Sequence, residues 1–437
     1  MKILKFGGTS VGTAARMKDV ANLILDGEEK IVVLSAMSGT TNNLVEISNY
    51  LYKKNSDGAG EVISKMEVKY ANHVKELYDT DEYKEKGMQL IRERFAYIKT
   101  FTNKVFTVFE EKEILSQGEL ISTGMFNLYL QEKGVKSCLL PALDYMRIDK
   151  NNEPDSAYIR ENLKLLLEKN PGYDIYVTQG YICRNSFGEV DNLQRGGSDY
   201  TASLIGAALL ADEIQIWTDI DGMHNNDPRF VENTKPVSEL SFDEAAELAY
   251  FGAKILHPTC VLPAKVNNIP VRLLNTMDPK AAGTLISSHQ CNDRIAAIAA
   301  KDNITALRIK SGRMLLAYGF MRKVFEIFES YKTPIDMITT SEVGVSVTID
   351  NNRHLDDIVD DLKKFGTVEV DKDQVIICIA GDFSAEKKGY ASKIFDALRD
   401  VPIRMISYGG SSHNVSILVN AEDKIAALRG LSASLFD

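Results

Sequence analysis

Two glycine-rich loops in the sequence carry a cation beside groups suited to binding anions. Residues 5–10 read KFGGTS and follow an apolar run, and residues 195–199 read RGGSD and precede a helical pattern. A strand-to-helix loop presents free backbone N–H groups, and glycine lets a phosphate approach them closely. Lys5 adds a point charge suited to a phosphoryl group, and Arg195 can hold a carboxylate bidentately. These loops therefore indicate the binding of two anions.

Neither loop matches a common nucleotide-binding signature. No Gly-Lys-Ser/Thr follows residues 5–10 at Walker A spacing, and the chain has no G-x-G-x-x-G. Each loop also has a structural explanation. The loop at residues 5–10 could be an ordinary Gly-Gly turn between a strand and a helix, and residues 195–199 could be a capped helix start with a solvated arginine. Asp199 is expected to orient a nearby lysine rather than to act as a base.

Hydroxyl groups and carboxylates follow other predicted strands. Residues 35–42 (SAMSGTTN) precede a helix, and capping it is their expected role, with ligand contact as the alternative. Thr218 and Asp219 end another strand, and Asp227 and Arg229 follow in a turn. Two cationic loops, hydroxyls and an acidic turn suit phosphoryl transfer to a charged small molecule, where positioning and charge neutralisation do most of the catalysis.

Three further residues carry weaker signals. Lys254 ends a helical pattern, where a cation suits the helix dipole. His257 precedes Pro258 and is expected to be structural. Glu119 is a lone carboxylate whose role these patterns leave open.

A parallel sheet is needed to bring these side chains together. The first 40 residues alternate strand, loop, amphipathic helix and strand, which predicts a right-handed βαβ unit. Residues 1 to about 290 are predicted to form one α/β domain, with three αβα layers around a large, mainly parallel sheet. The expected elements are strands at 3–6, 31–34, 137–140, 175–179, 214–218 and 271–274, mostly helical structure at 60–132 interrupted at 116–119, and helices at 200–210 and 242–250.

The rest of the chain contains an internal duplication. Three segments recur in the same order at nearly constant offset, namely 319–325 with 389–395, 335–338 with 403–406, and 345–347 with 415–417. Each copy predicts the ferredoxin-like βαββαβ alternation, and a chance likeness of two helix–hairpin units is the alternative. We expect one repeat at 303–380 and the other at 381–437, the second with a strand from 293–301.

Composition narrows the class of protein. The net charge is −10 and no basic stripe occurs, which argues against a nucleic-acid surface. The chain lacks a Cys-x-x-Cys pair, a signal-peptide h-region and any run of about 18 apolar residues. We therefore expect a soluble cytoplasmic protein without a membrane partner. The five cysteines are scattered, at Cys138, Cys183, Cys260, Cys291 and Cys378.

As a set, the motifs resemble the signature of the aspartate kinases, which belong to the amino acid kinase superfamily. The set comprises residues 5–10, 118–119, 195–199, 218–219 and 251–254 in this order. The C-terminal duplication resembles the paired ACT domains of that family, so the resemblance covers nearly the whole chain. It points to the monofunctional, lysine-sensitive class, and no homoserine dehydrogenase domain is expected after the repeats.

The resemblance implies transfer of the γ-phosphoryl group of ATP to the β-carboxylate of L-aspartate. This is the first step toward lysine, threonine and methionine. Mg²⁺ would arrive with ATP, and no resident metal site is implied. Feedback by an amino acid, with lysine as the candidate, would act at the ACT domains, through which the chain would form a homodimer or a tetramer.

The resemblance also assigns roles to individual residues. Lys5, Gly8 and Asp199 would be catalytic, with Asp199 organising the lysines. Aspartate would be held by Ser35, Thr41, Glu119, Arg195 and Ser198, with Glu119 facing its ammonium group. ATP would be held by Lys5, Gly7, Gly8, Thr218, Asp219, Asp227, Arg229, Lys254 and Ile255. The effector would contact Met314, Phe320, Met321, Asp336, Ser341, Glu342 and Val343.

Some alternatives remain open at this point. Ala317-Tyr318 stands where the lysine-sensitive pattern has Ser-Arg, which leaves the effector's identity open. Another amino acid kinase, acting on glutamate, acetylglutamate or a nucleoside monophosphate, would lack the paired repeat and the full motif set. A non-catalytic amino-acid sensor would not need Lys5 and Asp199, and a nucleic-acid-binding regulator conflicts with the acidic charge.

Overall fold

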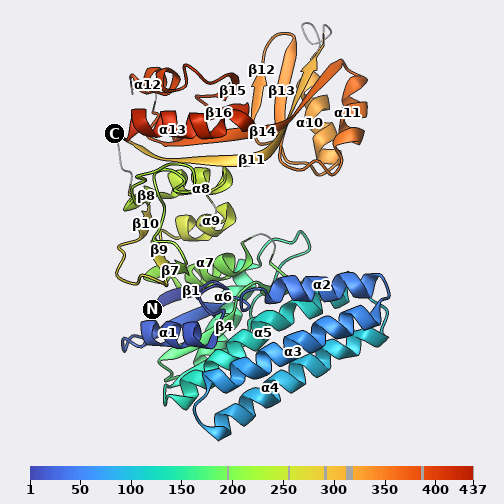
Figure 1. Cartoon of the computed structure of the whole chain (residues 1–437), viewed down its shortest axis with the longest axis vertical. Coiled ribbons are helices and arrows are strands. Elements are labelled where there is room, and N and C mark those ends of the chain that lie inside the picture. Colours follow the sequence, from blue (N-terminus) through green and yellow to red (C-terminus); the bar gives the residue numbers. More distant parts are fainter. Residues whose placement is uncertain (194–195, 254–255, 290–292, 312–317, 385–387, 437) are drawn as a thin grey trace. The chain divides into compact units, whose positions relative to one another are not determined.

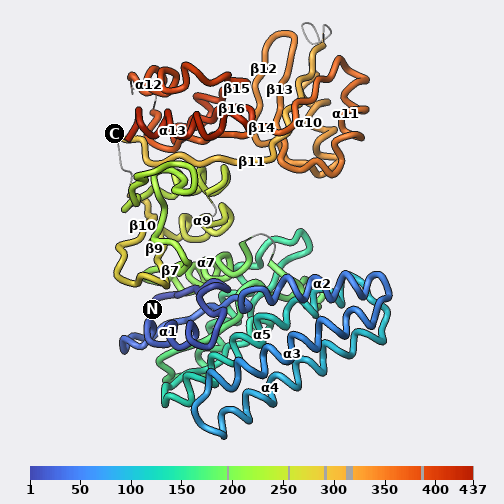
Figure 2. Tube along the Cα trace, in the orientation of Figure 1, coloured from blue at the N-terminus to red at the C-terminus, as the bar shows by residue number. Residues whose placement is uncertain are grey.

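The computed structural model describes residues 1–193, 196–253, 256–289, 293–311, 318–384 and 388–436. The chain divides into two compact units (Figure 1). The first comprises residues 1–223 and 255–288, and the second comprises 224–254 and 289–437. The path of the chain within each unit can be followed in Figure 2.

The first unit is built on a mainly parallel sheet. Its strands lie in the order β3-β4-β2-β1-β7-β9-β10, in which neighbours pair in parallel except for the antiparallel pair β9–β10. The strands are β1 (Lys2–Phe6), β2 (Lys30–Leu34), β3 (Ser137–Leu140), β4 (Ile175–Gln179), β7 (Glu213–Thr218), β9 (Val271–Asn275) and β10 (Thr284–Ser287). A separate hairpin pairs β5 (Ile182–Arg184) with β6 (Val190–Asn192).

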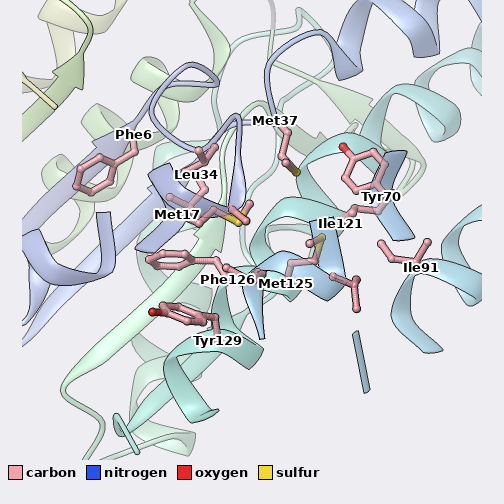
Figure 3. Packing of buried hydrophobic residues seen from close by; sticks show 14 of the residues in the cluster. Phe6, Met17, Leu34, Met37, Tyr70, Ile91, Ile121, Met125, Phe126 and Tyr129 are labelled. Atoms are coloured by element: carbon pink, nitrogen blue, oxygen red, sulfur yellow. The ribbon is translucent and has the colours of Figure 1, made fainter. Parts of the chain in front are cut away.

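Helices cover both faces of this sheet, as the three-layer prediction requires. They are α1 (Ala14–Ile24), α2 (Thr40–Tyr52), α3 (Ser56–Leu77), α4 (Asp81–Thr100), α5 (Val108–Glu132), α6 (Ser156–Lys169), α7 (Gly197–Leu209) and α9 (Pro258–Val266). Side chains from α1 to α5 form one core with alternate residues of β1, β2 and β4, including Phe6 and Leu34 (Figure 3). Because successive strand residues point to opposite faces, Ile3 and Lys5 belong to the other face, where α7 contacts β1.

Two local predictions in this unit are wrong. Helix α5 runs without a break through residues 116–119, and these residues are buried. The hydroxyls of residues 35–42 do not cap α2, because the N-cap is Gly39, in the left-handed conformation with φ of 79° and no capping side chain. Those hydroxyls are therefore available for other contacts.

The second unit contains one antiparallel sheet in the order β12-β13-β11-β14-β16-β15. Its strands are β11 (Ile295–Lys310), β12 (Ile338–Thr340), β13 (Gly344–Ile349), β14 (Thr367–Gly381), β15 (Ile403–Ser407) and β16 (Asn414–Asn420). The helices are α10 (Phe320–Ser330), α11 (Leu355–Lys363), α12 (Tyr390–Ala397) and α13 (Lys424–Leu435). Gly319 and Gly389, which match in the duplication, both begin a helix with φ near 85°, at 81° and 88°.

The two long strands are shared between the two repeats. The second half of β11 pairs with β13 and with the first half of β14, which completes a ferredoxin-like unit with α10, β12 and α11. The second half of β14 pairs with β16 and with the first half of β11, which completes the other unit. The strand expected at 293–301 is thus the first half of β11. Along β14, pairing with the second half of β11 gives way to pairing with β16 near Asp373. The boundary between the repeats that was expected at residue 380 lies at the other end of β14.

Residues 224–254 belong to the second unit by their packing. This segment contains β8 (Glu239–Ser241) and α8 (Phe242–Tyr250). Phe251, directly after α8, joins a core cluster with Ile304, Ile376 and Leu418 of the antiparallel sheet. Among the described residues, no helix has both the length and the apolar character that crossing a membrane requires.

Candidate active site

A cavity of about 510 Å³ opens in the first unit where loops follow β1, β2 and β4 and meet the start of α7. Four of the residues expected to bind the amino-acid substrate line it, namely Ser35, Thr41, Glu119 and Ser198. The fifth, Arg195, lies outside the described residues. The remaining lining residues are Gly8, Thr9, Ala36, Met37, Ser38, Gly39, Asn42, Tyr181 and Gly197.

The loop after β1 approaches the loop after β2 very closely. Ser38 N donates to Gly8 O at 3.1 Å, and a Cβ on Gly8 would lie 2.8 Å from Ala36 O. A side chain at this position would therefore force the two loops apart. The neighbouring loop residue Ser10 is buried and shares a 2.8 Å hydrogen bond with Thr276, which fixes the loop to the end of β9.

Lys5 and Asp199 form an ion pair on the α7 face of the sheet. Lys5 Nζ lies 2.6 Å from Asp199 Oδ1, and their side chains are 10% and 17% exposed. Asp199 is in the first turn of α7, and the ideal Cβ position of Gly7 is 3.6 Å from Lys5 Nζ. The structure thus joins the two glycine-rich motifs through one partly desolvated ion pair, in which Asp199 holds the Lys5 ammonium group close to the loop of Gly7.

The start of α7 is fixed by Gly196. This residue has φ of 76° and serves as the N-cap without a side-chain hydrogen bond. A Cβ here would lie 2.4 Å from His257 Cβ. His257 itself caps α9 by accepting a hydrogen bond from Thr259 N, so its expected structural role is confirmed.

Glu119 is a carboxylate buried at the base of the cavity. Its residue is 4% exposed, and Ala36 N donates to its Oε1 at 3.2 Å. Burial raises its pKa to about 8, against the smaller opposing effect of that hydrogen bond. A cation that bound beside Glu119 would favour the ionised form and would be held strongly in this position.

A row of polar side chains behind Glu119 was not singled out in the sequence. Ser122 Oγ donates to Ser35 O at 2.8 Å, and Thr123 Oγ1 donates to Glu119 O at 2.7 Å. Gln179 Nε2 donates to Thr123 Oγ1 at 2.8 Å. The sequence does show polar residues recurring along α5, which could have indicated this row. Because a helix break was predicted at 116–119, these residues were not recognised as part of one buried helix.

Tyr70 and Tyr181 were also missed. The Tyr70 hydroxyl shares a 2.6 Å hydrogen bond with Thr40, the residue before Thr41 of the cavity lining, and both partners are buried. Tyr181 lines the cavity with φ of 70°, which is uncommon for a bulky residue. Thr201 accepts a hydrogen bond from Tyr181 N at 3.0 Å and holds it beside α7.

The residues expected to hold ATP are divided between the two units. Thr218 ends β7 and Asp219 follows it in the first unit, as predicted. Asp227 and Arg229 form a turn in the second unit, where Arg229 Nη2 lies 2.6 Å from Asp227 Oδ2. Burial alone would raise the pKa of Asp227, but the hydrogen bonds from Arg229 hold it below its usual value. Lys254 and Ile255 lie outside the described residues.

Two of the residues expected to bind an effector line a common cavity. Ser341 and Val343 line a cavity of about 570 Å³ with Arg308 and Lys310. Phe320 instead packs in the core of the first repeat, with Met321 against it. Glu342 lies in the turn between β12 and β13, and Met314 lies outside the described residues.

Asp336 makes an internal ion pair. Its side chain is 1% exposed, Lys301 Nζ lies 2.7 Å from its Oδ1, and Tyr250 OH donates to the same oxygen at 3.0 Å. Lys301 also lies 2.9 Å from Asp350. Burial raises the pKa of Asp336 in spite of the opposing attraction of Lys301. In the described part of the chain, no three His, Cys, Asp or Glu side chains form a group that could hold a metal ion.

Known protein families and individual proteins match this chain over both of its units. Residues 1–275 match the model of the amino acid kinase family, and residues 377–435 match that of an ACT domain. The chain is 34% identical over 456 residues to lysine-sensitive aspartokinase 3 of Escherichia coli, covering 100% of this chain and 99% of that one. The chain belongs to the aspartokinase family.

Other aspartokinases also match this chain over its full length. Aspartokinase 1 of Arabidopsis thaliana, a chloroplastic protein, is 35% identical over 464 residues, which cover 100% of this chain and 80% of that one. The crystal structure of E. coli aspartokinase III in complex with aspartate and ADP matches with a TM-score of 0.88 at 34% identity, covering 100% of both chains. The same protein with lysine and aspartate matches with a TM-score of 0.79, again over 100% of both chains.

Proposed function

We propose that the chain is an aspartate kinase, which transfers the γ-phosphoryl group of ATP to the β-carboxylate of L-aspartate and forms 4-phospho-L-aspartate. The observation that carries this proposal is the cavity in the first unit. There a buried carboxylate, several hydroxyls and the N-terminus of α7 meet beside the loop that follows Lys5. The kinship with an enzyme whose structure holds aspartate and ADP supports the choice of substrates.

The chemistry needs charge neutralisation rather than a base. A β-carboxylate oxygen of aspartate attacks the γ-phosphorus and forms a new P–O bond, while the bond from that phosphorus to the β,γ-bridging oxygen breaks and ADP leaves. Because a carboxylate with a pKa near 4 is ionised at neutral pH, no proton must be removed from the nucleophile. The main barrier is repulsion between two anions, which cations and backbone N–H groups reduce.

Lys5 is placed to supply this neutralisation. Asp199 holds its ammonium group at 2.6 Å and keeps it near the loop of Gly7 and Gly8. We assign Lys5 and Gly8 to the transferring phosphoryl group and Asp199 to the orientation of Lys5. The free N–H groups at the start of α7 add a partial positive charge on the same face of the sheet.

The amino-acid substrate would be recognised at both of its ends. Glu119 would accept the substrate ammonium, and Arg195 would hold a carboxylate, with Ser35, Thr41 and Ser198 as hydroxyl partners. The row of polar side chains Ser122, Thr123 and Gln179 would keep Glu119 and the loop at Ser35 in place. Glu119 must lose its proton to pair with the ammonium, so substrate binding is coupled to pH.

The nucleotide would be held by Lys5, Gly7, Gly8, Thr218, Asp219, Asp227, Arg229, Lys254 and Ile255. Mg²⁺ would enter as the Mg–ATP complex, since this ion keeps much of its water and is commonly bound through substrate phosphates. It would reduce the negative charge on the phosphates that aspartate approaches.

We further propose regulation through the C-terminal repeats. An amino acid, with lysine as the first candidate, would act at Met314, Phe320, Met321, Asp336, Ser341, Glu342 and Val343. The lysine complex of the E. coli relative supports lysine, and the repeats would also form a homodimer. Lys301 and Tyr250 both contact Oδ1 of Asp336, so an effector that used this carboxylate would share it with an internal ammonium group. We place the kinase domain at 1–290, and divide the repeats near 373, where strand pairing changes partner.

The test of the proposed activity is ADP release from Mg–ATP with aspartate, glutamate or no acceptor. The proposal predicts release that depends on aspartate. Release with glutamate alone would keep the chemistry and discard the substrate, and release with neither would discard the kinase. Titration of the active enzyme with lysine tests the regulation, where unchanged activity at millimolar lysine would exclude this effector.

A further inference from the structure

We propose that Asn226, Lys424 and Arg429 are positioning residues for nucleotide binding, through which the C-terminal helix α13 holds the turn that presents Asp227 and Arg229. The proposal rests on the nucleotide role assigned to that turn under the proposed function. It gives α13 of the second regulatory repeat the role of supporting this turn. All the contacts that carry it lie within the second unit.

Asn226 joins α13 to the turn with both ends of its side chain. The residue is 2% exposed, its Nδ2 donates to Leu428 O of α13 at 3.1 Å, and its Oδ1 accepts from Asp227 N at 2.8 Å. A movement of α13 would therefore act directly on the backbone of Asp227. An alanine in place of Asn226 would leave both partners without this link.

Two cations of α13 hold the other end of the turn. Arg429 Nε donates to Phe230 O at 3.1 Å. Lys424 Nζ lies 4.3 Å from the centre of the Phe230 ring, and Asp302 of β11 holds the same ammonium at 2.8 Å through both carboxylate oxygens. The Lys424 side chain is only 11% exposed, which favours its contact with the Phe230 ring, whereas the Asp302 side chain is 51% exposed, so solvent partly screens the ion pair.

Apolar packing anchors the same segment. Val231 is 6% exposed and belongs to one core cluster with Ala427, Leu428 and Leu431 of α13. On the other side, Ile298 N of β11 donates to Asn225 O at 2.8 Å. The turn is thus held between α13 and the first half of β11, both of which belong to the second repeat.

Within the turn, the two proposed nucleotide residues restrain each other. Arg229 Nε lies 2.9 Å from Asp227 Oδ1, and Phe230 N donates to Asp227 O at 3.1 Å. A shift of Phe230 would therefore move the Asp227–Arg229 pair as a unit. Loss of an α13 contact should weaken nucleotide binding while leaving the distinct aspartate cavity of the first unit unchanged.

The test compares Asn226→Ala and Arg429→Gln with Arg399→Gln as a matched control. Arg399 is 71% exposed and pairs only with Asp396 on the described surface of the same repeat. We measure Mg–ADP affinity by calorimetry, the KM values for ATP and aspartate, and the melting temperature. Each test variant should raise Kd for Mg–ADP and KM for ATP by about three- to tenfold, the effect of one hydrogen bond, with KM for aspartate and all values of the control unchanged.

Folded test variants with the wild-type Kd for Mg–ADP, or with equal rises in both KM values, would overturn the positioning role. Hydrogen exchange on the wild-type protein provides a measurement that does not depend on the variants folding. Because linkage is reciprocal, Mg–ADP should slow amide exchange in residues 424–435, and unchanged exchange in the nucleotide-bound protein would contradict the inference. Failure of the wild-type protein to bind Mg–ADP would instead overturn the proposed function, and this inference with it.

Discussion

Glu119 should make aspartate binding depend on pH in the neutral range. The group is buried and has a pKa of about 8, so its protonated form is about ten times more abundant than its ionised form at pH 7. Pairing with the substrate ammonium requires the ionised form. KM for aspartate should therefore fall about tenfold from pH 6 to pH 7, fall further to pH 8, and level off above that value.

Replacing Glu119 by Gln should remove this dependence. The variant keeps the shape of the side chain but cannot form the charge-assisted hydrogen bond, which contributes about 1.5–3 kcal/mol. KM for aspartate at pH 8 should rise by about 10- to 100-fold and stay nearly constant between pH 6 and pH 8.5, while KM for ATP changes little.

The assay is initial-rate ADP release at saturating Mg–ATP, over a series of aspartate concentrations at each pH. Glu113→Gln is the matched control, because this carboxylate lies on the same helix α5 and accepts a hydrogen bond from Tyr97 rather than lining the cavity. The control should keep the wild-type pH profile. A wild-type KM that does not change from pH 6 to pH 8, or a Glu119→Gln variant with the wild-type slope, would refute the role given to Glu119.

Three further predictions concern catalysis and stability. Lys5→Met should lower kcat by roughly 10²–10³ with the protein still folded, and near-normal turnover would remove Lys5 from the phosphoryl site. Gly196→Ala should lower the melting temperature by more than about 4 °C, since a Cβ there would lie 2.4 Å from His257 Cβ. The control Gly134→Ala, with φ of 73° and open space around it, should cost less, and equal losses would show that backbone conformation alone matters. Because the folded pKa of Glu119 is raised, its neutral form stabilises the protein fully below the unfolded pKa near 4.5, and this contribution is lost as pH rises through 8. Substrate-free Glu119→Gln should therefore gain melting temperature relative to wild type between pH 6 and pH 9, and a constant difference would contradict this.

Much of the fold could be predicted because its determinants are local. Several buried strands of the first sheet contain short apolar runs, such as residues 31–34 of β2, and the predicted strand at 3–6 differs from β1 by one residue. The repeated glycines at 319 and 389 marked two equivalent helix starts, because a positive φ is accessible to glycine. Asp199 was expected to orient a nearby lysine, and in the structure it pairs with Lys5.

The errors arose where long-range packing decides the conformation. Gly118 and the polar residues around it resemble a helix break, but a Cβ on Gly118 would lie 2.8 Å from Ala36 Cβ. Glycine thus allows α5 to pack against the loop after β2, and the helix continues. Val231 and Phe251 are likewise buried against β11, β14 and α13, which lie far along the chain. A local sequence pattern cannot indicate a packing partner that lies so far along the chain.

The most direct test of the central claim is a single-turnover reaction of the protein with Mg–[γ-³²P]ATP and aspartate, quenched with hydroxylamine. Hydroxylamine converts an acyl phosphate to a hydroxamate, which mass spectrometry can assign to the β- or the α-carboxyl group. We predict β-aspartyl hydroxamate in an amount equal to the ADP formed, and none with Lys5→Met on the same time scale. ADP formed without hydroxamate, or hydroxamate on the α-carboxyl group, would contradict the proposed reaction.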